Sequence, residues 1–291
     1  MTDMITIKLL GPPIISRQGQ VVKPDTNKSI ALLAYLILTP NYIDSREKIA
    51  ALLWPNYSQS RAKANLRRTL SALIKVVGRE KFITNRDTIQ LLTNHVVCDV
   101  IQLTRCLENY KNEKSWLTQA IALTNEVQGE FLSGFLMQDN NEFEGWLGQV
   151  RNQFVQIFNT LFRRIISTYE QNQMWDEAIT VAQNWIRQNG SSEEAHNQLI
   201  RLYAKSNLKF EAMKQYARCV EQLRQDLDLP PSLDIQKFAA QLNTHLDSMK
   251  HLDDLSQENG QPIFFVGQTQ DLGSLERLFN RKDTNIFVFS T

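Results

Sequence analysis

The sequence is poor in cysteine and in long apolar runs. Its 291 residues include three cysteines, too few for a disulfide framework and typical of a reducing compartment. No apolar run reaches the roughly 18–20 residues that span a bilayer. The first residues lack the basic and then apolar pattern of a secretion signal. These absences predict a cytoplasmic protein that does not bind a membrane.

Catalytic and metal-binding patterns are also scarce. The eleven glycines are scattered, and the sequence contains no H-E-x-x-H, G-x-S-x-G or G-x-G-x-x-G. His95, Cys98 and Cys106 could supply three ligands to zinc, but a fourth ligand and a paired C-x-x-C are missing nearby. His196 has no nucleophile or carboxylate at a meaningful spacing, so we expect a packing or surface histidine. We therefore predict no enzyme, no cofactor and no metal site.

The charges are divided unevenly along the chain. Residues 1–105 hold 15 Lys and Arg against 7 Asp and Glu, whereas the remainder holds 17 against 24, and the net charge is +1. A basic module is suited to a polyanion such as DNA, and the acidic module needs another role.

The order of the expected elements indicates two modules. Alternating and β-branched residues with turn signals predict a small antiparallel sheet over 5–10, 14–15 and 21–22. Helical spacing predicts helices over 28–38, 45–54 with Ser45 as N-cap, and 59–77 closed by Gly78. A β-hairpin is expected over 82–92. The fold class is therefore mainly α with a small β component, and the first domain is expected to cover 1–98.

From residue 99 onward nearly the whole pattern is helical, and it contains a repeat. Tyr169 recurs as Tyr203 and Ala178 as Ala212, each at an offset of 34 residues, which is typical of tetratricopeptide-like helix pairs. We expect an all-α repeat domain over 99–252, with a last helix at 232–252. Residues 253–291 are expected to form a linker and two strand-like runs.

The helix at 59–77 carries the pattern most relevant to function. Its apolar residues fall on one side at about 100° per residue, and basic, amide and small residues fall on the other. Such a face fits the major groove, where Arg pairs with guanine and Asn with adenine. The candidates for base contact are Arg61, Asn65, Arg68, Ser71 and Lys75. The candidates for phosphate or wing contact are Arg67, Lys81 and Arg86. A merely solvated basic face is the alternative, and Trp54, Tyr57 and Leu66 are expected in the core.

Several short segments resemble the amino-terminal half of the SARP-type bacterial transcriptional regulators. They are Leu9–Pro13, Ala31–Leu36, Ser45–Glu47, Leu52–Pro55 and Ala64–Arg67. The resemblance implies an OmpR-like winged helix-turn-helix, with the helix near 60–77 as recognition helix. It also implies that the loop Pro55–Ser60 faces RNA polymerase.

Downstream segments resemble the bacterial transcriptional activator domain, a bundle of tetratricopeptide-like helices. They are Gly129–Phe135, Trp146 with Arg151, Glu193–His196 and Leu227–Ser232. The two resemblances together cover roughly residues 5–250. They imply a DNA-binding activator that uses its helical repeats for regulation, for partner contact or for a homodimer on promoter DNA.

The segment Phe265–Gln268 is similar to the start of STAND-type ATPase domains. That pattern has Arg where this chain has Gln268, and no phosphate loop follows before Thr291. Two alternatives to the activator therefore stay open. One is a protein-interaction scaffold that has lost DNA binding, and the other is the front part of an ATP-switched regulator.

Overall fold

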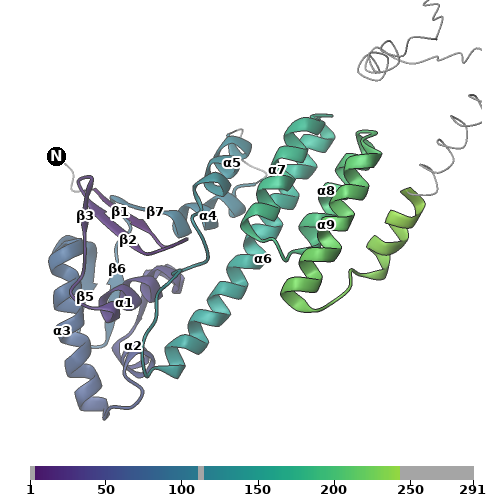
Figure 1. Ribbon diagram of the computed structural model, residues 1–291. Helices are drawn as coiled ribbons and strands as arrows, with labels where there is room; N and C mark the ends of the chain where they lie inside the picture. Colours follow the sequence, from purple (N-terminus) through teal and green to yellow (C-terminus); the bar gives the residue numbers. More distant parts are fainter. Residues whose placement is uncertain (1–3, 111–114, 243–291) are drawn as a thin grey trace, which may run out of the picture. The chain divides into compact units, whose positions relative to one another are not determined.

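The computed structural model describes residues 4–110 and 115–242 (Figure 1). The described residues up to Ile235 belong to one compact unit. The linker and strand-like runs expected over 253–291 lie outside the described residues.

The first sheet has four strands in the order β3-β2-β1-β7. Its strands are β1 (Ile5–Lys8), β2 (Ile14–Arg17), β3 (Gln20–Val22) and β7 (Val96–Cys98). The first three pair antiparallel, as the sequence predicts, and β7 adds a parallel edge with Val96 opposite Ile5. Strand β7 was not predicted, because three residues that pair across some 90 positions leave no local signal.

Three helices follow the sheet in the predicted order. They are α1 (Asn27–Leu38), α2 (Arg46–Leu53) and α3 (Gln59–Val77). The Ser45 hydroxyl accepts a hydrogen bond from the Lys48 amide at 3.2 Å, which confirms it as the N-cap of α2. Gly78 ends α3 with a φ of 107°, a conformation that side chains rarely adopt.

A second sheet contains the predicted hairpin, β5 (Phe82–Thr84) and β6 (Thr88–Leu91). A third strand, β4 (Ile43–Ser45), pairs antiparallel with β6 and leads directly into α2. Short 3₁₀ turns at Pro40–Tyr42 and Arg79–Lys81 precede β4 and β5. The hairpin is thus attached to the beginning of α2, the first helix of the helix-turn-helix.

The rest of the unit is helical, as predicted. Its helices are α4 (Asp99–Glu108), α5 (Trp116–Glu126), α6 (Asn141–Gln171), α7 (Trp175–Gln188), α8 (Glu193–Lys205) and α9 (Lys209–Leu227). Residues 233–242 are also helical. None of the helices in the described ranges is both long enough and apolar enough to cross a membrane.

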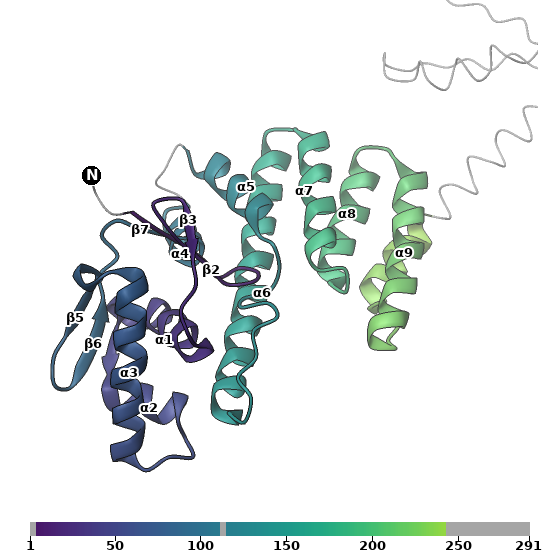
Figure 2. The same cartoon turned by 60° about the vertical axis from the view of Figure 1, so that its left-hand side comes forward.

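The 34-residue repeat is present in the structure. The amide of Met174 donates to the Tyr169 carbonyl at 2.9 Å, and the equivalent bond joins Leu208 to Tyr203 at 2.8 Å. Gln173 and Asn207, also 34 residues apart, both have positive φ, at 58° and 60°. The pairs α6–α7 and α8–α9 therefore share one turn geometry, and they stand side by side in Figure 2.

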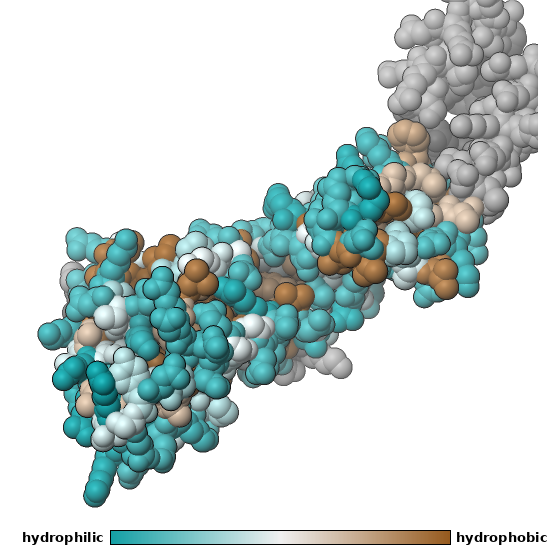
Figure 3. All heavy atoms as spheres, turned by 60° about the horizontal axis from the view of Figure 1, so that its bottom comes forward, coloured by the Kyte–Doolittle hydropathy of each residue, from teal (hydrophilic) through white to brown (hydrophobic). Residues whose placement is uncertain are grey.

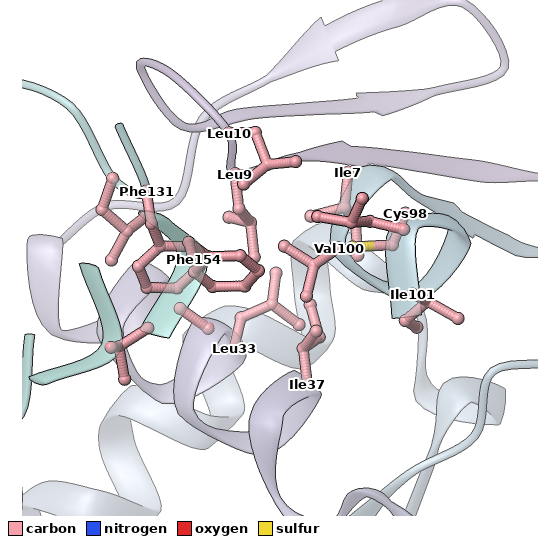
Figure 4. Packing of buried hydrophobic residues seen from close by; sticks show 14 of the residues in the cluster. Ile7, Leu9, Leu10, Leu33, Ile37, Cys98, Val100, Ile101, Phe131 and Phe154 are labelled. Atoms are coloured by element: carbon pink, nitrogen blue, oxygen red, sulfur yellow. The ribbon is translucent and has the colours of Figure 1, made fainter. Parts of the chain in front are cut away.

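One hydrophobic core runs from the sheet into the helical region. Ile7 and Leu9 lie close to Leu33 of α1, and Phe131 and Phe154 continue the same cluster (Figure 4). The Phe131 and Phe154 rings stack with centroids 5.1 Å apart. Because these residues are buried together, the winged helix and the helical region pack against each other.

Backbone hydrogen bonds reinforce this packing. The Gly11 amide donates to the Glu130 carbonyl at 3.0 Å, and the Leu132 amide donates to the Leu9 carbonyl at 2.8 Å. The Asn140 side chain, which caps α6, donates to the carbonyls of Leu52 and Leu53 at 3.1 and 3.2 Å. The segment after α5 and the start of α6 are therefore bonded directly to the winged helix.

Replacing Gly11 by alanine is expected to destabilise the fold by about 1–3 kcal/mol. Gly11 has a φ of +126°, and an added Cβ would lie 2.9 Å from the Gln128 Cβ. Gly19 is the matched control, because its φ is +82° but an added Cβ would meet nothing within 4 Å. Urea unfolding of the two variants should show the larger loss of unfolding free energy for Gly11→Ala. Equal losses would mean that the contact with Gln128 does not affect stability.

A buried histidine makes stability depend on pH. His196 is 3% exposed, and its ring nitrogens lie 2.9 Å from the Gly190 carbonyl and 2.7 Å from the Gln215 amide nitrogen. Burial lowers the pKa of His196. The unfolded chain therefore takes up this proton first, and stability should fall as pH drops below about 6.5, by up to about 1.4 kcal/mol per pH unit. Urea unfolding between pH 7.5 and pH 5 measures this loss, and His196→Gln should flatten the slope. An equally steep slope in that variant would assign the effect to other groups.

Candidate nucleic-acid interface

Helix α3 has two opposite faces of different chemistry. Its buried face consists of apolar residues and one threonine, namely Ala62, Leu66, Thr69, Leu70, Leu73 and Val77. Its exposed face is basic and polar, with Arg61, Arg67, Arg68, Ser71 and Lys75. The sequence predicted this division, because the period of the pattern matches the period of the helix.

The positive charges of this face are not neutralised by neighbours. Within the described ranges, no ion pair involves Arg67, Arg68 or Lys75. The surface around this end of the chain is predominantly hydrophilic in the space-filling view (Figure 3). Unpaired guanidinium and ammonium groups on one helix face can bind an anionic partner.

Tyr57 does not lie in the core, contrary to expectation. It is 43% exposed, and the Arg61 guanidinium lies 4.8 Å from its ring centroid. Trp54 and Leu66 are buried, as expected. The six residues Pro55–Ser60 are all exposed, and the Tyr57 ring is stabilised there by the Arg61 cation.

Asn65 lies at the edge of the exposed face. It lines, together with Arg68, an open cleft of about 730 Å³. The opposite wall comes from the helical region, where Gly134 and Leu136 line the cleft, and the Asn27 side chain donates to the Leu136 carbonyl at 3.2 Å. The loop that contains Gly134 and Leu136 therefore lies next to one edge of α3, which no local pattern could indicate.

The turn between β5 and β6 lies against the start of α2. The Arg46 Nε donates to the Asn85 carbonyl at 2.9 Å, and the Arg46 amide donates to the Asp87 carbonyl at 2.8 Å. Arg86, between them, is exposed. Burial and the nearby positive charge of Arg67 lower the pKa of Arg46. These contacts gather Arg46, Arg67 and Arg86 on one side of α3.

The sequence reasoning missed Arg46 as a member of this basic group. A local signal existed, because a cation in the first turn of a helix is unfavourable with respect to the helix dipole. Such a residue therefore indicates a role other than helix stabilisation. Its proximity to Arg67 could not be read locally, since it depends on how α2 crosses α3.

Lys81 is placed differently from what its position in the sequence indicated. Its side chain is 4% exposed, its Nζ donates to the Asn94 carbonyl at 3.3 Å, and Glu80 lies 4.0 Å away. The 3₁₀ turn Arg79–Lys81 directs this side chain inward. A buried ammonium cannot reach a phosphate, so the expected phosphate contact by Lys81 is wrong.

The three zinc candidates do not share one environment, because His95 is exposed and the two cysteines lie in the interior. Cys98 and Cys106 are both buried, and burial raises the pKa of the Cys98 thiol to about 12. Among the described residues, no group of three or more His, Cys, Asp or Glu is placed to hold a metal ion.

Comparisons with known proteins bear on both parts of the chain. Residues 107–243 match the family described as "Bacterial transcriptional activator domain". No curated protein matches the sequence. The fold is similar to that of Mycobacterium tuberculosis EmbR, solved in complex with a low-affinity phosphopeptide, with a TM-score of 0.60 and 19% identity over 95% of this chain and 71% of that chain.

At this level of identity the likeness to EmbR concerns the fold, which joins a small sheet and winged helix to a helical repeat region. The family match concerns the helical region itself. In this chain a winged helix-turn-helix is thus followed by a helical region that matches the bacterial transcriptional activator domain family.

Proposed function

We propose that the chain activates transcription by binding double-stranded promoter DNA through α3. The observation that carries this proposal is the division of α3 into a buried apolar face and an exposed face of unpaired cations. A helix of this kind fits the major groove, and the core behind it holds it rigidly.

Base contact is assigned to the exposed face. Arg61, Arg68 and Lys75 offer hydrogen-bond donors to guanine, and the small Ser71 permits close approach. Asn65 reaches the groove from the edge of the face, beside the cleft that it lines. These five residues form the proposed reading surface.

Phosphate contact is assigned to the basic group formed by Arg46, Arg67 and Arg86 beside the β5–β6 turn. The sequence predicts this role for Arg67 and for the exposed Arg86. Arg46 is added because it is bonded to the β5–β6 turn, which contains Arg86. Such contacts set the register of the protein on the duplex without reading sequence. Lys81 has no part in this surface.

Partner contacts follow from the family resemblance. The exposed loop Pro55–Ser60 is proposed to face RNA polymerase while α3 lies in the groove. A single winged helix covers a short site, so two chains on a direct repeat are proposed to share one promoter.

The test is binding of the whole chain to the duplex upstream of its own gene, beside a scrambled duplex of equal length. Binding should prefer the upstream duplex and weaken steeply from about 50 to 200 mM salt, with a log–log slope of about −0.9 per phosphate contact. Equal binding to both duplexes would contradict sequence reading. No binding at low salt would favour the interaction scaffold.

A further inference from the structure

Besides the cleft next to α3, the helical region holds a cavity that DNA binding does not use. Its volume is about 520 Å³, within the range of small-molecule sites. The walls come from α6, from the end of α7 and from the segment that follows α5. These elements lie side by side in both ribbon views (Figures 1 and 2).

The floor of the cavity is an aromatic row along α6. Phe154, Phe158 and Phe162 all line it, and their spacing of four residues places them along one side of the helix. The first ring is stacked on Phe131, with centroids 5.1 Å apart and planes 21° apart. The last ring is stacked on Trp185, at 5.4 Å and 7°.

The middle ring of this row, Phe158, differs from its two neighbours. Phe158 is only half-buried, and among the described residues it pairs with no other ring. Each of its two neighbours in the row has a planar partner. Phe158 lines the cavity with a ring that is only half-buried, so it can stack with one more flat ring.

The polar lining contains amide side chains, two arginines and one carboxylate, and that carboxylate, Glu130, is paired with Arg151. The Asn159 carbonyl oxygen is occupied by the Trp185 indole N–H at 3.1 Å, so its amide nitrogen remains to donate. Arg187 donates to Asn184 at 2.8 Å and, within the described residues, has no carboxylate partner. The available groups therefore favour a ligand that carries a hydrogen-bond acceptor with negative charge.

Bonds within the protein hold the walls of the cavity in place. Arg151 donates to the carbonyls of Phe131 and Leu132 at 2.9 and 2.8 Å and pairs with Glu130 at 3.3 Å. The Gln128 amide donates to the Leu10 carbonyl at 3.2 Å, so the winged helix holds the roof segment from outside. A held roof lowers the entropic cost of ligand binding.

We propose that this cavity of the activator domain binds a planar aromatic carboxylate, with its ring on Phe158 and its carboxylate directed to Arg187 and Asn159. The site is independent of the DNA surface on α3, and it supplies the regulator with a place for a small-molecule signal.

The probe for this site is 2-naphthoate, titrated calorimetrically into the whole chain. One molecule should bind per chain, and cyclohexanecarboxylate, which has the same charge but no flat ring, should bind at least about tenfold more weakly. Absence of naphthoate binding up to about 1 mM, or equal binding of the two acids, overturns the proposal.

Variants locate the bound probe. Phe158→Ala should weaken naphthoate binding about tenfold, whereas Phe210→Ala, at a 72% exposed ring on α9, should leave it unchanged. Val155→Trp places a bulky ring at a 40% exposed position of the cavity wall, so it should block binding while the chain stays folded. Arg187→Gln should also weaken binding about tenfold. Unchanged binding in Val155→Trp, or an equal loss in Phe210→Ala, overturns the proposal.

Discussion

Replacing Arg68 by alanine is expected to weaken binding to the preferred duplex by about 1–3 kcal/mol, roughly fivefold to a hundredfold. Arg68 lies near the middle of the exposed face of α3, and within the described residues it makes no ion pair that the substitution would break. The change therefore removes the donors that we propose to contact bases and leaves the buried face of the helix intact. Titration of wild type and variant against the upstream duplex measures the loss.

Two further variants separate base contact from general attraction. Arg67→Ala, on the phosphate side of α3, should weaken binding to the upstream and scrambled duplexes by similar factors. Arg218→Ala removes an exposed arginine from α9, outside the winged helix, and should change neither. Unchanged affinity of Arg68→Ala for the preferred duplex would remove Arg68 from the reading surface.

Replacing Phe131 by alanine is expected to destabilise the protein by about 3–5 kcal/mol. The Phe131 ring is 0% exposed, and it packs against Phe154 and Trp146, with centroids at 5.1 and 6.4 Å. Its neighbours in sequence carry the backbone bonds to Leu9 and Gly11. The cavity left behind would therefore lie where the winged helix meets the activator domain. Urea unfolding followed by circular dichroism measures the loss.

The exposed ring of Phe210 provides the control for this substitution. Phe210→Ala removes the same side chain from a position that is 72% exposed, and its effect should stay within about 0.5 kcal/mol. If Phe131→Ala cost no more than Phe210→Ala, the junction would not depend on the buried aromatic cluster. Two separate transitions in the Phe131 variant alone would show that the substitution had uncoupled the two parts.

Features set by neighbours along the chain were predictable from the sequence. The length of α3, its capping by Gly78 and its basic face depend on residues within a few turns of one another. The hairpin at 82–91, the cap at Ser45 and the 34-residue repeat are local in the same sense. Local spacing and capping therefore determined the elements and most of the proposed reading surface.

Features set by distant residues were not predictable. The strands β4 and β7 each have three residues and exist because remote strands offer them partners. Lys81 is buried and its Nζ donates to the Asn94 carbonyl, whereas Tyr57 is exposed and stacks on Arg61. Arg46 joins the basic group through bonds to the β5–β6 turn.

The packing of the winged helix against the helical region was likewise not predictable from local sequence. Local patterns in the sequence specify a small sheet, three helices and a hairpin followed by helical repeats, because periodicity and caps lie within short segments. Only the folded structure shows that the two parts pack together. The Gly11 amide donates to the Glu130 carbonyl, and the Asn140 side chain donates to the Leu53 carbonyl. Backbone groups and apolar faces that local folding leaves unpaired must find partners elsewhere in the chain. The local sequence pattern does not identify those distant partners.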